Sequence, residues 1–191
     1  MKIKNLKIAI IAILAVSLMS FTAVKEKMVN VNESTITWIG KKVTGGQHQG
    51  TIALKSGMLK FDDNTLTGGA FVMDMASINN TDLQGGGKSK LEGHLKSEDF
   101  FGVEKHPTAT LNITKTEKQD GNMYAVTGNL SIKGITNPIT FNMNVEEHTA
   151  SASVKVDRTK YDIKYGSSSF FDGLKNKAIN DDFDLNVTLK F

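Results

Sequence analysis

The sequence contains no cysteine, so it can form neither a disulfide nor the cysteine-linked lipid anchor of bacterial lipoproteins. Its four histidines, His48, His94, His106 and His148, show none of the short spacings of zinc sites, so no metal is expected. Helical hydrophobic periodicity is nearly absent. Lysines and acidic residues are interspersed, and nothing in their distribution indicates a nucleic-acid partner. Stability must therefore come from packing of a β-rich core.

The amino terminus has the pattern of a secretory signal peptide. Three lysines precede an apolar run over residues 8–16, and small and polar residues follow. We expect residues 1–23 to be the leader, with cleavage between Ser20 and Ala23, and a periplasmic or secreted location. The alternative is an uncleaved anchor, although the run is shorter than the roughly 18 to 20 residues that a spanning helix needs.

Residues 24–191 have the length of one domain with a real interior. The formal net charge of +3 includes the leader lysines, so we expect the mature protein to be close to neutral.

From Ser34 onward, apolar and polar residues alternate in short runs separated by Gly, Asn and Asp. This period of two predicts an all-β fold, an antiparallel barrel or sandwich of eight or nine strands. Alternation is clearest over 182–191. The side chains predicted to face inward are Ile36 and Trp38; Ile52 and Leu54; Leu59 and Phe61; Phe71, Met73 and Met75; Ala109, Leu111 and Ile113; Tyr124, Val126, Leu130 and Ile132; Ile139, Phe141, Met143 and Val145; Val154 and Val156; and Phe183, Leu185, Val187, Leu189 and Phe191.

One segment interrupts the strands. Residues 88–95 are predicted to form a short helix that closes one barrel end, and Ser97 can cap a further turn. Phe100 and Phe101 follow, and we expect one ring in the barrel mouth and the other beneath the helix. Pro107 is expected to begin the next strand, where its missing amide donor is tolerated.

Three stretches carry a resemblance to a known family. They are the double-phenylalanine passage over 94–111, the strand, glycine-containing turn and strand over 128–139, and residues 156–163 with Arg158. Together they resemble the YceI family of lipocalin-like barrels, and the resemblance covers nearly everything after the leader. Lys160 and Asp162 stand where many members have Asp and Gly. The resemblance implies an up-and-down lipocalin-like barrel that carries a polyisoprenoid or an isoprenoid quinone in the periplasm, without catalysis and without a cofactor.

The predicted inward face is rich in aromatic rings and methionines, which suit a flexible apolar chain. Sequence leaves open whether the interior is a filled core or a ligand cavity, because every barrel core is apolar. The predicted ligand-binding residues are Trp38, His48, Phe61, Phe71, Met73, Met75, Phe100, Phe101, Phe141, Met143 and Arg158.

Two of these residues are polar and have two interpretations each. His48 shares the parity of Gly50 and Ile52, so it is expected to project toward the cavity and either bind a ligand carbonyl or be satisfied by its neighbours. Arg158 shares the parity of Val156 and must find solvent, a carboxylate or carbonyls when buried. It is either a clamp at the barrel end or a contact to a polar ligand head.

The remaining motifs indicate no catalysis. Residues 85–89 resemble a phosphate-binding loop in composition but fail its spacing, because Asp82 stands where glycine is required. Acidic pairs such as Asp62-Asp63 lie in turns and have no nucleophile beside them. Alternative functions are a fatty acid or fatty amide carrier and a filled-core structural or interaction barrel. A transient membrane contact is expected of a lipid carrier, and a homodimer is one of the oligomeric states left open.

Overall fold

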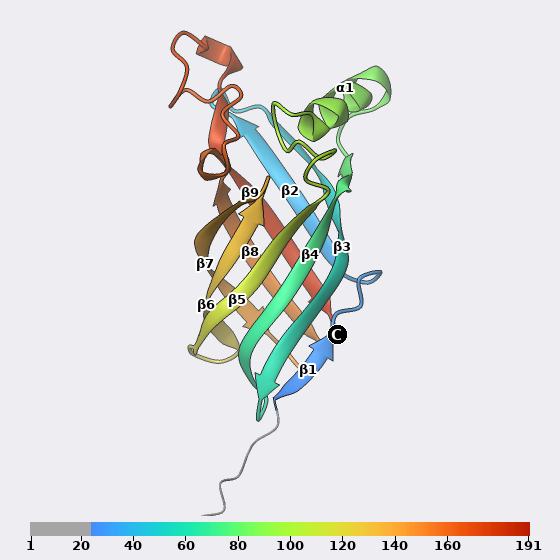
Figure 1. The fold of residues 1–191 in the computed structure, drawn as a ribbon, viewed down its shortest axis with the longest axis vertical. Helices are drawn as coiled ribbons and strands as arrows, with labels where there is room; N and C mark the ends of the chain where they lie inside the picture. The colour runs from blue at the N-terminus through green and yellow to red at the C-terminus, as the bar shows by residue number, and fades with distance from the viewer. Residues whose placement is uncertain (1–23) are drawn as a thin grey trace, which may run out of the picture.

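The computed structural model describes residues 24–191, and the signal peptide expected over 1–23 lies outside them. All strands form one antiparallel sheet that closes into a barrel, because β3 pairs with β4 as well as with β2 (Figure 1). The elements are β1 (Lys25–Met28), β2 (Thr35–Lys42), β3 (Gln47–Asp62), β4 (Thr65–Asn80), α1 (Gly85–Lys96), β5 (Thr108–Lys118), β6 (Met123–Ile132), β7 (Ile135–Val145), β8 (Thr149–Asp157), the 3-10 turns η1 (Arg158–Tyr161) and η2 (Lys175–Lys177), and β9 (Ile179–Lys190). The predicted all-β antiparallel barrel with a short helical segment is confirmed.

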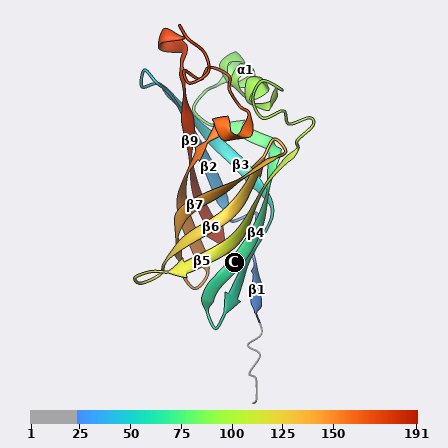
Figure 2. The same cartoon turned by 60° about the vertical axis from the view of Figure 1, so that its left-hand side comes forward.

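Short turns connect most strands and give the barrel two ends. Figure 2 shows α1 and the segment between β8 and β9 together at one end, which we call the mouth end. Asp63 and Asn64 join β3 to β4 at the far end with φ of 43° and 66°. Lys133 and Gly134 join β6 to β7 with φ of 52° and 75°. Two central residues with positive φ make the turn whose twist matches that of paired strands.

Strand β3 differs from its prediction. Residues 52–54 and 59–61 were expected to lie in two strands, but they belong to one strand of 16 residues. Its register against β4 shifts between Thr51 and Ala53 and again between Leu54 and Ser56. A bulge adds an unpaired residue and reverses which parity faces inward. Strand β1, which pairs with the same edge of β3 as β2 but nearer the far end, was not predicted.

Strands β7 and β8 share the shortest ladder between consecutive strands of the barrel wall. Their pairing covers three residue pairs, from Met143 opposite Ala152 to Val145 opposite Ala150. By contrast, ten pairs join β6 to β7 and nine join β8 to β9. Toward the mouth end, the two strands therefore lie in the wall without a continuous ladder between them.

The interior contains two hydrophobic clusters. One lies at the mouth end and includes Trp38, Phe100 and Phe101. The other lies toward the far end and includes Leu59 and Phe61. Partly buried residues pack against both clusters at the waist of the barrel, namely Met73, Leu111, Phe141, Ala152 and Leu185.

Helix α1 covers part of the mouth and begins three residues before its predicted start. Glu92 accepts a hydrogen bond from the backbone N–H of Asn80 at 2.7 Å, and Lys88 donates to the side chain of Asn79 at 2.8 Å. These contacts join α1 to the end of β4. In residues 24–191, no helix has the length and hydropathy required to cross a bilayer.

Asp82 organises the loop between β4 and α1. Its carboxylate accepts hydrogen bonds from the backbone N–H of Gln49 at 3.0 Å and from the amide of Asn80, and it lies 2.7 Å from His48 Nδ1. Burial alone would raise the pKa of Asp82, but the hydrogen bonds from Gln49, His48 and Asn80 lower it to about 2 from its usual 3.8. The ionised carboxylate therefore stabilises the fold.

Replacing Asp82 by Asn should lower the free energy of unfolding at pH 7 by about 1 to 2 kcal/mol, allowing for partial exposure of the side chain. Because the folded pKa of Asp82 lies below its usual value, its contribution is present above about pH 4 and is lost as the pH falls toward 2. Urea unfolding between pH 7 and pH 2.5 measures both effects. Asp120→Asn in the exposed turn before β6 is the matched control, and equal acid sensitivity in both variants would contradict the assignment.

Candidate functional site

The main cavity lies at the waist of the barrel between the two clusters. Its volume is about 100 Å³, and all twenty lining residues are apolar. They are Ile36, Ile52, Leu54, Phe71, Met73, Met75, Phe101, Ala109, Leu111, Leu130, Ile132, Ile139, Phe141, Met143, Ala152, Val154, Phe183, Leu185, Val187 and Leu189. Apolar cavities near this size stay dry and accept small hydrophobic molecules. The interior therefore has space for an apolar group.

A second cavity of about 60 Å³ adjoins the main cavity on its mouth side. Ile52, Phe101 and Phe183 line both cavities. The second cavity adds polar groups to an apolar wall, and its other lining residues are Trp38, Gly40, Ile78, Leu95, Phe100, Arg158, Ile179, Asn180 and Asp182. Polarity thus increases from the waist toward the mouth.

The structure places nine of the eleven predicted ligand-binding residues in the walls of these cavities. The residues that line the main cavity are Phe71, Met73, Met75, Phe101, Phe141 and Met143. Those that line the second cavity are Trp38, Phe100, Phe101 and Arg158, so Phe101 lines both. Phe100 and Phe101 point in different directions, as expected. Phe101 reaches into the barrel, whereas Phe100 packs edge-on against His94 of α1 with ring centroids 5.6 Å apart.

The expectation that His48 projects toward the cavity is wrong. His48 lines neither cavity, and its Nδ1 lies 2.7 Å from the carboxylate of Asp82, with 36% of its side chain exposed. The parity of His48 along the strand is as expected. However, His48 is the second residue of β3, where the hairpin of β2 and β3 extends past the enclosed interior. At this position the imidazole can reach the carboxylate of Asp82 outside the barrel interior.

Phe61 is buried but does not line either cavity. Its ring packs against Phe191 with centroids 6.0 Å apart, and the ammonium group of Lys27 lies 5.1 Å from its centroid. Two bulges separate Phe61 from the cavity-lining part of β3, so Phe61 closes the far end. Phe61 thus lies outside the walls of both cavities, and its contact with a ligand stays a prediction.

Arg158 is 1% exposed and is held by backbone carbonyls. Its Nε, Nη1 and Nη2 donate to the carbonyls of Asn180, Ile163 and Ile179 at 3.0, 2.7 and 3.1 Å. Nη2 also lies 3.7 Å from a carboxylate oxygen of Asp181. These contacts connect the end of β8 to the start of β9, which is the geometry of the predicted clamp.

The charges around Arg158 are balanced inside the protein. Burial lowers the pKa of Arg158 below its usual value, and the carboxylates of Asp181 and Asp157 oppose that shift. Burial also acts to raise the pKa of Asp181, but the hydroxyls of Ser167 and Ser169 and the charge of Arg158 lower it overall. Both groups therefore remain ionised at neutral pH.

Trp38 supplies a buried polar atom for which the described residues provide no hydrogen-bond partner, its indole Nε1. The ring lies against Gly50, where a Cβ would stand 2.6 Å from the indole and 1.9 Å from the carbonyl oxygen of Asn79. Glycine at position 50 thus lets the indole lie flat against β3. A buried indole N–H normally finds an acceptor, so Nε1 is a candidate donor to a ligand in the second cavity.

Sequence reasoning missed several wall residues in the second cavity. Ile179, Asn180 and Asp182 come from the start of β9, and Leu95 comes from α1. The inward face of β9 had been identified by alternation, but its four residues from Phe183 to Leu189 were not assigned to the ligand site. Their regular parity was the signal that could have included them.

This arrangement can enclose an apolar chain and hold a small polar head near the mouth. In residues 24–191, no group of three or more His, Cys, Asp or Glu side chains is placed to hold a metal ion. The acidic pair Asp62-Asp63 lies at the far-end turn, away from both cavities.

The family model described as the YceI-like domain matches residues 28–191. Among curated relatives, the UPF0312 protein of Pectobacterium atrosepticum is 48% identical over 46 residues, which are 24% of this chain and 23% of the relative. A UPF0312 protein of Pseudomonas aeruginosa is 47% identical over 47 residues, 25% and 24% of the two chains. The matched segment thus spans about a quarter of the length of these relatives.

Solved structures share the fold at low sequence identity. BcnA of Burkholderia cenocepacia has a TM-score of 0.68 at 20% identity, covering 84% of this chain and 98% of BcnA. A polyisoprenoid-binding domain from Saccharophagus degradans has a TM-score of 0.61 at 13% identity, with coverage of 87% and 97%. The YceI protein of Campylobacter jejuni has a TM-score of 0.55 at 20% identity, with coverage of 100% and 90%.

Proposed function

Because the chain belongs to the YceI-like domain family, we propose that it is a non-catalytic carrier of an apolar lipid. The ligand class we propose is a polyisoprenoid or an isoprenoid quinone, with its tail in the main cavity and its head toward the mouth. The location we propose is the periplasm, reached through the leader expected over residues 1–23. The observation that carries the proposal is the main cavity, whose wall contains no polar side chain.

The cavity wall favours a hydrocarbon tail. Burying each methylene contributes about 0.8 kcal/mol, so an apolar chain binds strongly with few polar contacts. Three methionines, Met73, Met75 and Met143, give the wall side chains that adapt to an irregular, branched tail. A structural neighbour described as a polyisoprenoid-binding domain supports the same ligand class.

The second cavity favours a neutral head over a charged one. A fatty acid would direct its carboxylate to a cation, and Arg158 is the cation that lines this cavity. Arg158 already donates to three carbonyls and faces Asp181. Trp38 Nε1 instead offers a neutral donor, which suits a quinone carbonyl or a prenyl hydroxyl. Trp38 thus takes the head-group role that was predicted for His48.

Native mass spectrometry of the mature protein, purified without detergent from a lipid-containing host, tests the proposal. We expect a discrete bound mass that solvent extraction releases and that matches a prenyl chain or a quinone. The control is the same preparation after delipidation, which should regain the mass on incubation with an isoprenoid quinone. A fatty-acid mass would replace the proposed ligand with the alternative. Protein that stays unliganded with both lipid classes would overturn the carrier function in favour of a structural or interaction barrel.

A further inference from the structure

Exposed aromatic side chains gather in one segment at the mouth end, residues 164–178, which we call the mouth loop. Phe170 and Phe171 are 50% and 51% exposed, and Tyr165 is 49% exposed. Val43, also exposed, lies beside the loop because its N–H donates to the carbonyl of Ala178 at 3.0 Å. Large apolar side chains that gather on a surface mark an interaction site more often than scattered ones do.

The backbone of the mouth loop is held in place, so these rings project from an anchored support. The N–H groups of Phe170 and Phe171 both donate to the carbonyl of Ser167, at 3.3 and 3.0 Å. Ser169 donates through its hydroxyl to Asp181. The carbonyl of Gly166 accepts from Ile179 N–H at 2.8 Å, and Ile179 lines the second cavity. The loop is therefore fixed directly to the cavity mouth.

Lysines lie within the mouth loop and beside it, and one of them, Lys164, pairs with Asp162 at 2.6 Å. Lys42, Lys164, Lys175 and Lys177 are all exposed, and the acidic residue within the loop is Asp172. The ammonium group of Lys164 lies 5.2 Å from the ring centroid of Phe170. Phenylalanines bordered by lysines are the composition of segments that enter the interface of anionic membranes.

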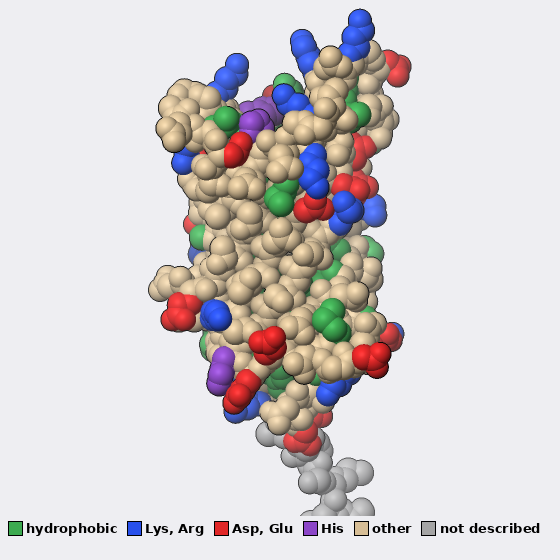
Figure 3. All heavy atoms as spheres, turned by 180° about the vertical axis from the view of Figure 1, so that it is seen from behind, with side chains coloured by type: hydrophobic (Ala, Val, Ile, Leu, Met, Phe, Trp, Pro, Cys, Tyr) green, Lys and Arg blue, Asp and Glu red, His purple; other side chains and the backbone are tan. Residues whose placement is uncertain are grey.

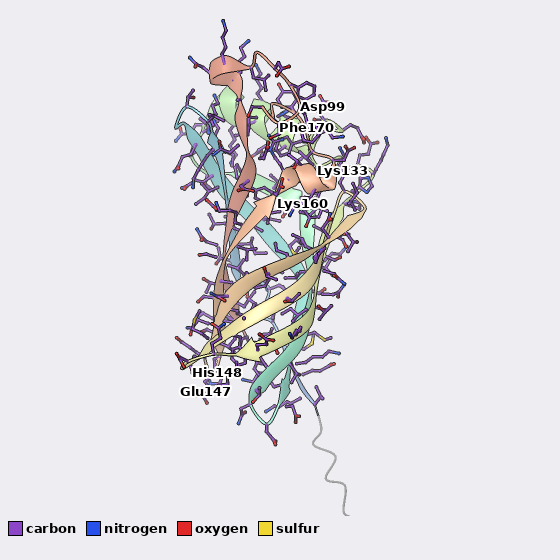
Figure 4. The ribbon with its side chains drawn as sticks, turned by 90° about the vertical axis from the view of Figure 1, so that its left-hand side faces the viewer. Asp99, Lys133, Glu147, His148, Lys160 and Phe170 are labelled. Carbon is purple, nitrogen blue, oxygen red and sulfur yellow. The ribbon has the colours of Figure 1, made fainter. Side chains whose placement is uncertain are left out.

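The turns at the opposite end of the barrel differ in charge from the mouth loop. In Figure 4, Phe170 lies at the mouth end, whereas Glu147 and His148 lie at the far end. The far-end turns over 63–64, 119–122 and 146–148 carry acidic residues and neither lysine nor arginine. Figure 3 shows lysines projecting from the mouth end in the view from behind. A negative surface would therefore attract the mouth loop more than these turns.

We propose that the mouth loop docks the protein on an anionic phospholipid surface, with Phe170 and Phe171 inserted at the headgroup level. A second copy of the chain fits this surface less well, because a two-fold contact would place the four lysines of one copy against those of the other. Docking brings the second cavity to the bilayer surface. The proposal concerns the outside of the molecule and does not depend on which ligand the cavity holds.

Vesicle co-sedimentation with residues 24–191 tests this surface, because this part of the chain contains the whole sheet and both hydrophobic clusters. One vesicle population is phosphatidylcholine alone, and the other contains phosphatidylglycerol in addition. We expect binding to the anionic vesicles that weakens as salt is raised. The double variant Phe170→Ser/Phe171→Ser should bind the anionic vesicles at least tenfold more weakly than the parent. The double variant Lys175→Gln/Lys177→Gln should also bind them at least roughly tenfold more weakly.

The matched control is Met28→Ser, which removes a side chain that is 66% exposed at the far end and should leave vesicle binding unchanged. Circular dichroism of each variant verifies that the barrel is folded. Equal binding to both vesicle populations, or equal binding by the parent and the phenylalanine variant, would overturn the proposal. Self-association that the phenylalanine variant abolishes, without vesicle binding by the parent, would assign the surface to a second copy and would also overturn it.

Discussion

Replacing Arg158 by Ala should lower the free energy of unfolding by about 3 to 5 kcal/mol, the range found when one partner of a buried charged network is removed. The substitution leaves the carbonyls of Asn180, Ile163 and Ile179 without their donor and Asp181 without its nearest cation. For a domain of this length, the loss should lower the thermal midpoint by roughly 10 °C. Thermal and urea unfolding followed by circular dichroism measure the change.

Two further variants show whether Arg158 is a clamp or a ligand contact. Lys155→Ala removes an exposed partner of Asp184 and should cost less than about 1 kcal/mol. Arg158→Lys keeps the charge but gathers its three donors on one nitrogen, so it cannot reach all three carbonyls that the guanidinium spans and should restore little of the stability. A fully stable Arg158→Ala protein with weakened lipid binding would refute the clamp and support the head-group contact.

Replacing Ala109 by Phe should reduce affinity for an apolar ligand by roughly 10²- to 10³-fold. Ala109 is 4% exposed and lines the main cavity, so a phenyl ring at this position occupies space that ligand carbons would otherwise fill. Excluding about four or five methylene-sized groups costs about 3 to 4 kcal/mol of binding free energy. The chain has one tryptophan, Trp38, in the adjoining cavity, so quenching of its fluorescence by a short-chain isoprenoid quinone reports binding.

The control for the filled cavity is Ala125→Phe. Ala125 lies between the buried residues Tyr124 and Val126 of β6, so its side chain points outward and the added ring leaves the cavity unchanged. Quinone titrations should then match the parent within experimental error. If Ala109→Phe binds the quinone as tightly as the parent while remaining folded, the tail does not occupy the main cavity.

The fold could be predicted because alternation is a local property. From β5 to β9, every residue predicted to face inward is at least partly buried, including Phe191, which follows β9 and packs against the far-end cluster. In β3 the residues predicted to face inward are also buried, but the single strand was predicted as two because the bulge that reverses its parity leaves no reliable mark in sequence. Strand β1 escaped prediction because four residues are too few to show a period.

The apolar wall of the site was predictable, but its polar atoms were not. Parity alone suggested His48, yet whether a rim residue turns inward depends on Asp82, which lies 34 residues away in the chain. Trp38 was identified as part of the wall, but the lack of a partner at Nε1 follows from packing in three dimensions.

Asp162 shows that a departure from the family pattern need not change the backbone. It stands where many YceI members have glycine, and it adopts φ of 57° and ψ of 29° at the end of η1. Asp tolerates this left-handed conformation better than most residues. The turn that leads to Ile163 and the Arg158 carbonyl contacts is therefore retained.

The three-pair ladder between β7 and β8 is the place where the barrel can widen most easily. Any increase in circumference must break backbone hydrogen bonds between two neighbouring strands, and fewest have to be broken here. Ile139 and Phe141 on β7, with Ala152 and Val154 on β8, also line the main cavity. The pairing of β7 with β8 is thus the part of the wall that separates most easily, and if the proposed lipid is larger than the cavity, it would be accommodated by parting these two strands.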